Sequence, residues 1–116
     1  MSRHDPRVSL LQMQDYARRA QGVIGAHTLE DLSKDDVVRL AIERALEVIG
    51  EAANRFPAEF RAKYPDVEWR KIIGMRNVLI HGYDIVQSDV LWDTVQESLP
   101  TLLNQIEQML RELEKP

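Results

Sequence analysis

Cysteine is absent from this sequence of 116 residues, which excludes disulfide bridges and thiolate metal sites. Long apolar runs are missing too, since none approaches the roughly 18 residues that a membrane-spanning helix needs. Residues 1–6 lack the apolar core of a secretory signal peptide. His4 and His27 have no neighbours at the spacing of metal ligands, so we expect no metal and no other cofactor. These features predict a cytoplasmic protein that does not enter the membrane.

Alternation of apolar and polar residues with a period of two, which is typical of half-buried strands, does not extend far anywhere in the sequence. Internal repeats and low-complexity segments are also absent. The length fits a single domain, 1–116, that can bury a core. We therefore expect an all-α protein, an up-and-down bundle of four main helices plus one short helix.

The first predicted helix begins at Asp5 and Pro6. Aspartate accepts hydrogen bonds from the free amides of a helix start, and proline is tolerated in the first turn. Gly22 and Gly25 mark its end. Residues 26–34 are interpreted as a connection that contains one short turn.

The second predicted helix is the most regular. Ser33 and Asp36 resemble a capping box and predict its start. Apolar residues then recur at spacings of four and three, namely Val38, Ile42, Ala45, Ile49 and Ala52. Further apolar residues widen this surface, so the helix is either central to the bundle or in contact with a second subunit. Gly50 would allow another helix to approach closely, at a cost of about 1 kcal/mol in helix propensity.

Three more helices complete the predicted bundle. A short one over 58–64 lies between two prolines, and Asp66 is expected to cap another over 67–81. Gly82 would end that helix in the left-handed conformation. The last helix opens near residue 88 and continues to Leu113, with a kink expected at its internal proline, residue 100.

Charge is unevenly distributed along a chain whose formal net charge is −4. Residues 1–53 carry a net charge of −2 and residues 82–116 carry −5, whereas residues 54–81 carry six basic and three acidic side chains. One interpretation is a solvated surface of scattered charges. The other is a local attraction for phosphate groups on an otherwise acidic body.

The basic stretch leads into a polar motif. Arg76 and His81 are separated on a helix by about 7.5 Å of rise and about 140° of rotation, although a long arginine can sweep toward the helix end. Histidine can transfer protons near neutral pH, and arginine binds phosphate oxygens in bidentate fashion. Asn77 adds an amide and Tyr83 a phenol. These groups suit metal-free cleavage of RNA, which needs a base, an acid and a cation.

The spacing alone leaves alternatives open. A lone arginine and histidine on one helix are usually surface or capping residues, and the helix dipole alone favours histidine near a C-terminus. If His81 is catalytic, one imidazole is too few for both proton transfers, and a two-fold dimer would supply two. Glu43, Glu47 and Glu51 recur every four residues, most simply as a charge-paired stripe, or alternatively to orient Arg76.

The string Arg76-x4-His81-x-Tyr83 resembles the Arg-x4-His-x-Tyr form of the HEPN signature. The flanking sequence resembles the HepT family over the same region, and the similarity runs from about Val37 to Leu113. It is most specific in residues 49–53 (IGEAA), 64–70 (YPDVEWR) and 72–77 (IIGMRN).

This resemblance implies a homodimeric helical bundle whose paired motifs line a cleft at the dimer interface. It implies a metal-independent endoribonuclease, the toxin of a toxin–antitoxin pair whose antitoxin is a minimal nucleotidyltransferase. By position, Arg76 and His81 would be catalytic, Asn77 would support them, and Tyr83 would be the site of AMPylation that neutralises the toxin. The competing interpretation is a non-catalytic subunit that binds nucleotide and a nucleotidyltransferase partner through the same pocket.

Overall fold

Helices account for every regular element in residues 4–81 and 86–115, the part of the chain that this computed structural model describes. They are α1 (Pro6–Gly25), α2 (Leu29–Lys34), α3 (Asp36–Asn54), α4 (Ala58–Ala62), α5 (Trp69–His81), α6 (Ser88–Asp93), a π-helical turn (Thr94–Ser98) and α7 (Leu99–Glu114). The predicted all-α bundle is thus confirmed, although two separate short helices, α2 and α4, are present in place of one, and the last predicted helix is divided into α6, the π-helical turn and α7. Among these elements, no helix is long and apolar enough to cross a membrane.

The start of α3 differs from the prediction. The capping box lies at Thr28 and Asp31, where each side chain accepts a hydrogen bond from the other residue's amide and so opens α2. Asp35 then caps α3, because its carboxylate accepts a hydrogen bond from the Val37 amide at 2.9 Å. The predicted box at 33–36 is therefore wrong, and the segment before α3 contains a helix of its own.

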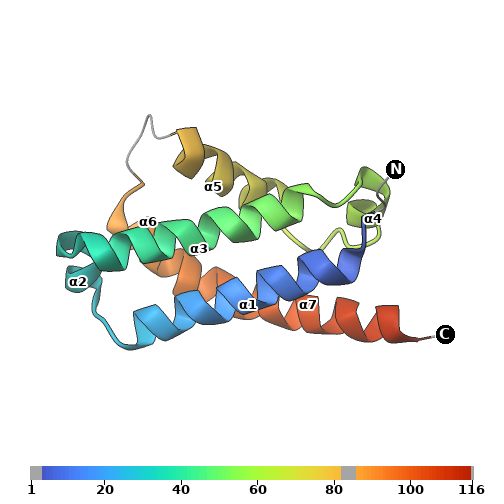
Figure 1. Cartoon of the computed structure of the whole chain (residues 1–116), viewed down its shortest axis with the longest axis horizontal. Coiled ribbons are helices and arrows are strands. Elements are labelled where there is room, and N and C mark those ends of the chain that lie inside the picture. The colour runs from blue at the N-terminus through green and yellow to red at the C-terminus, as the bar shows by residue number, and fades with distance from the viewer. Residues whose placement is uncertain (1–3, 82–85, 116) are drawn as a thin grey trace.

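Helix α3 lies at the centre of the bundle, with α1 against one side and α5 against another (Figure 1). Contacts on two sides explain why its apolar surface is wider than a single stripe. Helix α7 packs on α1, and α2 packs on α3 and α6. The core between these helices includes the fully buried side chains of Leu10, Met13, Ile42, Ile49, Phe56 and Ile106.

Helix α5 is peripheral. It packs mainly on α3 (Figure 1). Trp69 is the one residue of α5 that is buried, and the others are partly or well exposed. It begins two residues later than predicted, because the Trp69 amide donates to the carbonyl of Val67 in the preceding turn. Gly82, which is expected to follow His81 and end this helix, lies outside the described residues.

The last helical stretch contains the irregularity expected near Pro100. Proline has no amide hydrogen, so it cannot donate to the carbonyl one turn earlier. Just before it, the Leu99 amide donates to the carbonyl of Thr94, five residues back, which makes a π-helical turn. Helices α6 and α7 run in different directions on either side of this turn (Figure 1).

Candidate active site

The position of α5 is fixed at its N-terminus by Trp69. This side chain is 8% exposed, and its ring centroid lies 5.3 Å from that of Phe56. Its indole Nε1 donates a hydrogen bond to the carbonyl of Tyr64 at 3.0 Å, so the polar end of the ring is satisfied. Because α5 is a continuous helix, anchoring its start sets the direction in which Arg76 and His81 project.

Gly50 brings α5 close to α3 at the motif. A Cβ atom on Gly50 would overlap the Cβ of Arg76 and would lie 3.0 Å from the carbonyl oxygen of Ile72. A side chain at residue 50 would therefore push the helices apart. The sequence-based interpretation that Gly50 allows close helix approach is correct, and the residue that it admits is Arg76.

Arg76 is held on two sides. Its Nε donates a hydrogen bond to Oε2 of Glu51 on α3 at 2.8 Å, and its Nη2 lies 2.7 Å from the same oxygen in an ion pair. Its Nη1 donates to Oδ1 of Asn77 at 2.8 Å. The Arg76 side chain is 24% exposed, so the guanidinium group is oriented by protein groups and still reaches the surface.

His81 is the last residue of α5, and its side chain is exposed. Asn77 lies four residues earlier, so the two residues share one face of the helix. Arg76 points about 140° away from His81, toward α3. The structure thus connects Arg76 directly to Asn77. His81 lies on the same face of α5 as Asn77, about 6 Å further along the helix axis. Tyr83, the predicted modification site, lies outside the described residues.

For the three glutamates of α3, the sequence left two interpretations, a charge-paired stripe or a role in orienting Arg76, and each applies to some of them. Glu43 and Glu47 pair with arginines of their own helix, at 3.5 and 3.4 Å, as expected for a charge-paired stripe. Glu51 instead reaches across to Arg76, as the alternative proposed. The signal in the sequence was its position directly after Gly50, the residue at which the two helices meet.

Arg39 has a role that sequence reasoning missed. Its Nη1 donates to Oγ of Ser88 at 2.8 Å, and its Nη2 donates to the carbonyl of Val86. Val86, just before α6, and Ser88, its first residue, are thereby attached to α3. Arg39 also pairs with Glu43, which holds its guanidinium group in place.

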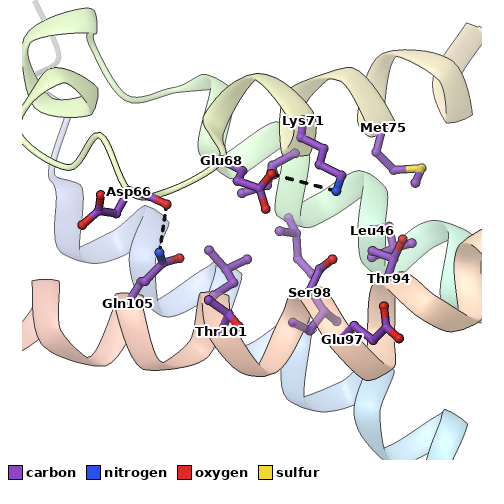
Figure 2. A pocket seen from close by; sticks show the side chains of 14 residues that line it. Leu46, Asp66, Glu68, Lys71, Met75, Thr94, Glu97, Ser98, Thr101 and Gln105 are labelled. Atoms are coloured by element: carbon purple, nitrogen blue, oxygen red, sulfur yellow. Dashed lines mark hydrogen bonds and ion pairs between the residues drawn. The ribbon is translucent and has the colours of Figure 1, made fainter.

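Two grooves flank α5. The first, the α5–α7 groove, is a largely apolar cavity of about 190 Å³ between α5 and the π turn with α7 (Figure 2). Glu68 and Lys71 form an ion pair at 3.9 Å on its α5 side. Neither Arg76 nor His81 lines this cavity. The predicted catalytic residues are therefore not directed into the α5–α7 groove.

The second groove, called here the α4–α5 groove, is an open hollow of about 600 Å³. Its polar lining consists of Asn54 at the end of α3, Arg61 on α4, and Arg70 and Asn77 on α5. Of the predicted site residues, Asn77 therefore faces this side of α5. Within residues 4–81 and 86–115, no group of three or more histidine or acidic side chains is arranged to hold a metal ion.

Comparison with known proteins gives a consistent result. The family model described as ribonuclease HepT-like matches residues 13–109. The chain is 42% identical over 84 residues to a protein named "Putative RNase" from Caldanaerobacter subterraneus subsp. tengcongensis, covering 72% of this chain and 75% of the relative. It is 41% identical over 80 residues to a "Probable ribonuclease HepT" from Thermococcus cleftensis, covering 69% and 73%. No solved structure matches the chain significantly.

Proposed function

Because the chain belongs to the family of HepT-like ribonucleases, we propose that it is a metal-independent endoribonuclease that uses Arg76 and His81. The observation that carries this proposal is the fixed guanidinium group of Arg76, held by Glu51 and Asn77 on the helix that ends in His81. A cation fixed before substrate binds can stabilise charge in a transition state without reorganising.

The reaction that suits these groups is internal transfer at phosphorus. The 2′-oxygen of one nucleotide attacks the adjacent phosphorus as its proton passes to a base. The bond from phosphorus to the 5′-oxygen breaks, and that oxygen takes a proton from an acid. The products are a 2′,3′-cyclic phosphate and a 5′-hydroxyl. In this scheme Arg76 binds the oxygens that gain charge, His81 transfers protons, and Asn77 supports Arg76.

A homodimer would complete the site. The scheme needs a base and an acid at the same time, and each chain offers one motif histidine. Two copies that meet near the C-termini of their α5 helices would bring two His81 side chains to one cleft. Val78 and Ile80 beside His81 are 44% and 45% exposed, and these apolar side chains would lose contact with water in such a dimer.

The biological role that fits this activity is the toxin of a cytoplasmic toxin–antitoxin pair with a minimal nucleotidyltransferase. The antitoxin would transfer AMP to Tyr83. This adds an anionic group two residues after His81, which would compete with substrate phosphate for Arg76. The proposal rests on the position of Tyr83 in the motif.

Cleavage of an RNA pool in excess EDTA tests the enzymatic proposal. Wild type should cut and leave 2′,3′-cyclic phosphate ends, while His81→Ala and Arg76→Ala should be inactive. Equal cleavage by all three would indicate a different site. Absence of cleavage by folded protein with unmodified Tyr83 would favour the competing function, a non-catalytic nucleotide-binding subunit.

A further inference from the structure

The α4–α5 groove differs in charge from the chain as a whole and from the groove on the other side of α5. Its lining contains two arginines and two asparagines and no aspartate or glutamate, although the chain as a whole carries a net charge of −4. The α5–α7 groove on the other side of α5 is lined by Asp66, Glu68 and Glu97 against one lysine. A polyanion is therefore attracted to one side of α5 and repelled from the other.

The two arginines of the α4–α5 groove are not neutralised by acidic side chains of the described residues. Neither Arg61 nor Arg70 takes part in an ion pair within the described part of the chain, whereas Arg39, Arg44 and Arg76 all do. Nε of Arg61 is buried and has no hydrogen-bond partner among the described residues. A guanidinium group in this condition gains most from an incoming anion that accepts its hydrogen bonds.

The groove continues toward the motif. Arg70, Gly74, Asn77 and His81 are separated by four, three and four residues, so they form one stripe along α5. A Cβ atom on Gly74 would meet nothing within 4 Å, so packing does not require glycine there. The missing side chain leaves the path between Arg70 and Asn77 open. Arg61, on α4, faces this path from the opposite wall.

We propose that the α4–α5 groove binds the phosphate backbone of single-stranded RNA and guides the strand to His81, with Arg61 and Arg70 as its phosphate contacts. This inference rests on the proposed ribonuclease function and adds the route of its substrate. Trp69, the aromatic residue in the lining, is buried and its indole N–H is already bonded to the protein. The groove thus offers cations rather than stacking surfaces, and its contribution is independent of base sequence.

The experiment measures binding and cleavage separately. Binding is measured by fluorescence anisotropy with a 2′-O-methyl oligonucleotide, which has no 2′-hydroxyl and cannot be cleaved, and cleavage with the matching RNA. The variants are R61Q/R70Q and, as a control that also removes two positive charges, R18Q/K115Q, whose native side chains are exposed and likewise outside the ion pairs of the described residues. Light scattering reports the oligomeric state of each.

We expect R61Q/R70Q to weaken binding and raise KM by about tenfold, with kcat changed by less than about twofold, because charge-assisted contacts are lost away from the reacting atoms. The slope of log K against log salt should become shallower by about 1.4, which corresponds to two phosphate contacts on a single strand. R18Q/K115Q should change the slope by less. If R61Q/R70Q and R18Q/K115Q behave alike, or if R61Q/R70Q changes the oligomeric state and not RNA affinity, the proposal is wrong.

A steric variant gives an independent test that keeps both charges. G74L places a side chain in the groove, and G22L places the same side chain on α1, where a Cβ atom also meets nothing within 4 Å. G74L should raise KM and G22L should not. Equal KM values for the two would contradict the proposal. Wild type that binds the uncleavable strand and cleaves nothing would overturn the ribonuclease function alone, whereas cleavage unaffected by any groove variant would overturn the groove alone.

Discussion

One carboxylate oxygen of Glu51, Oε2, accepts a hydrogen bond from Nε of Arg76 and forms an ion pair with Nη2 of the same side chain, across the interface of α3 and α5. This contact leaves Nη1 directed to Asn77, toward the face of α5 that ends in His81. In the proposed reaction, Glu51 would therefore decide which edge of the guanidinium group faces the substrate. In this arrangement it is a positioning residue that acts through Arg76.

Replacing Glu51 should affect turnover more than folding. We expect Glu51→Ala to lower kcat by about tenfold to a hundredfold, because small displacements of a positioned group are costly. Glu51→Gln should restore most of the activity, since its amide oxygen can still accept from Arg76. The thermal midpoint should fall by no more than a few degrees, because an ion pair this exposed contributes at most about 1 kcal/mol. Single-turnover cleavage and circular dichroism measure the two effects.

Glu47→Ala is the control for this prediction. Glu47 pairs with Arg44 on the same helix and not with Arg76. An identical loss of activity in Glu47→Ala and Glu51→Ala would mean that the effect is a general response to losing charge on α3.

Gly50→Ala tests the close approach of α3 and α5. The added Cβ would overlap that of Arg76, so the helices must separate, at a cost of about 1–3 kcal/mol. Gly22→Ala, where the space is open, should instead gain up to about 1 kcal/mol from helix propensity. Urea unfolding measures both free energies. A Gly50→Ala variant as stable as Gly22→Ala would show that the helices do not meet at Gly50.

Much of the fold could be predicted because its signals are local. Asp5 followed by Pro6 marks the start of α1, where Asp5 accepts from the amide of Arg7 at 3.0 Å. The start of α3 was misplaced because the sequence offers several capping residues between Thr28 and Asp36, and spacing does not decide among them. The choice depends on which side chains reach free amides once α2 has formed.

The candidate site was less predictable because its contacts are long-range. Periodicity shows that α3 and α5 each have an apolar face, but not at which residues the two faces meet. The contact between Glu51 and Arg76 joins residues 25 positions apart. The charge of the α4–α5 groove likewise depends on Arg61 and Arg70 facing one hollow, which requires the turn between α4 and α5 to be known.

Because of Tyr64, the free energy of unfolding should depend on pH in the alkaline range. Partial burial, and then its hydrogen bond to Glu112 at 2.7 Å, raise the pKa of its phenol above the usual 10.0. The folded state therefore keeps the phenolic proton more strongly than the unfolded chain does. The stability that the protonated phenol of Tyr64 adds to the folded state is fully present below about pH 10 and is lost as pH rises through the raised pKa. Tyr64→Phe should lose less than about 1 kcal/mol at neutral pH.

Thermal unfolding between neutral pH and strongly alkaline pH measures this difference. Above pH 10 the wild type should lose stability more steeply than Tyr64→Phe, so the two curves should converge. Parallel curves over that range would show that the phenol of Tyr64 has the same pKa in the folded and unfolded states.

Tyr83 is the residue for testing neutralisation by a nucleotidyltransferase. Tyr83→Phe should keep ribonuclease activity, because the proposed reaction uses no phenolic hydroxyl, and should resist the antitoxin, because AMP has no oxygen to join. Growth of cells that express both proteins, with intact mass of the purified chain, gives the readout. Tyr64→Phe serves as the control and should be neutralised normally. Normal protection of cells expressing Tyr83→Phe would exclude modification of this tyrosine as the mechanism.

A site shared between two chains predicts a specific behaviour in mixtures. If two His81 side chains serve one cleft as base and acid, a heterodimer of wild type and His81→Ala has lost one of the two proton transfers. General acid–base catalysis by one such group contributes about 10²–10⁴-fold, so the heterodimer should be nearly inactive. Titrating a fixed amount of wild type with excess His81→Ala, after subunit exchange, should therefore reduce activity per wild-type subunit.

The control for this experiment is a second variant that also exchanges subunits with wild type. Gln12→Ala is suitable, because Gln12 lies on α1, far from the motif in the sequence. Activity per wild-type subunit that stays constant with excess His81→Ala would mean that each chain carries a complete site, and that the second proton transfer must come from a group other than a second His81.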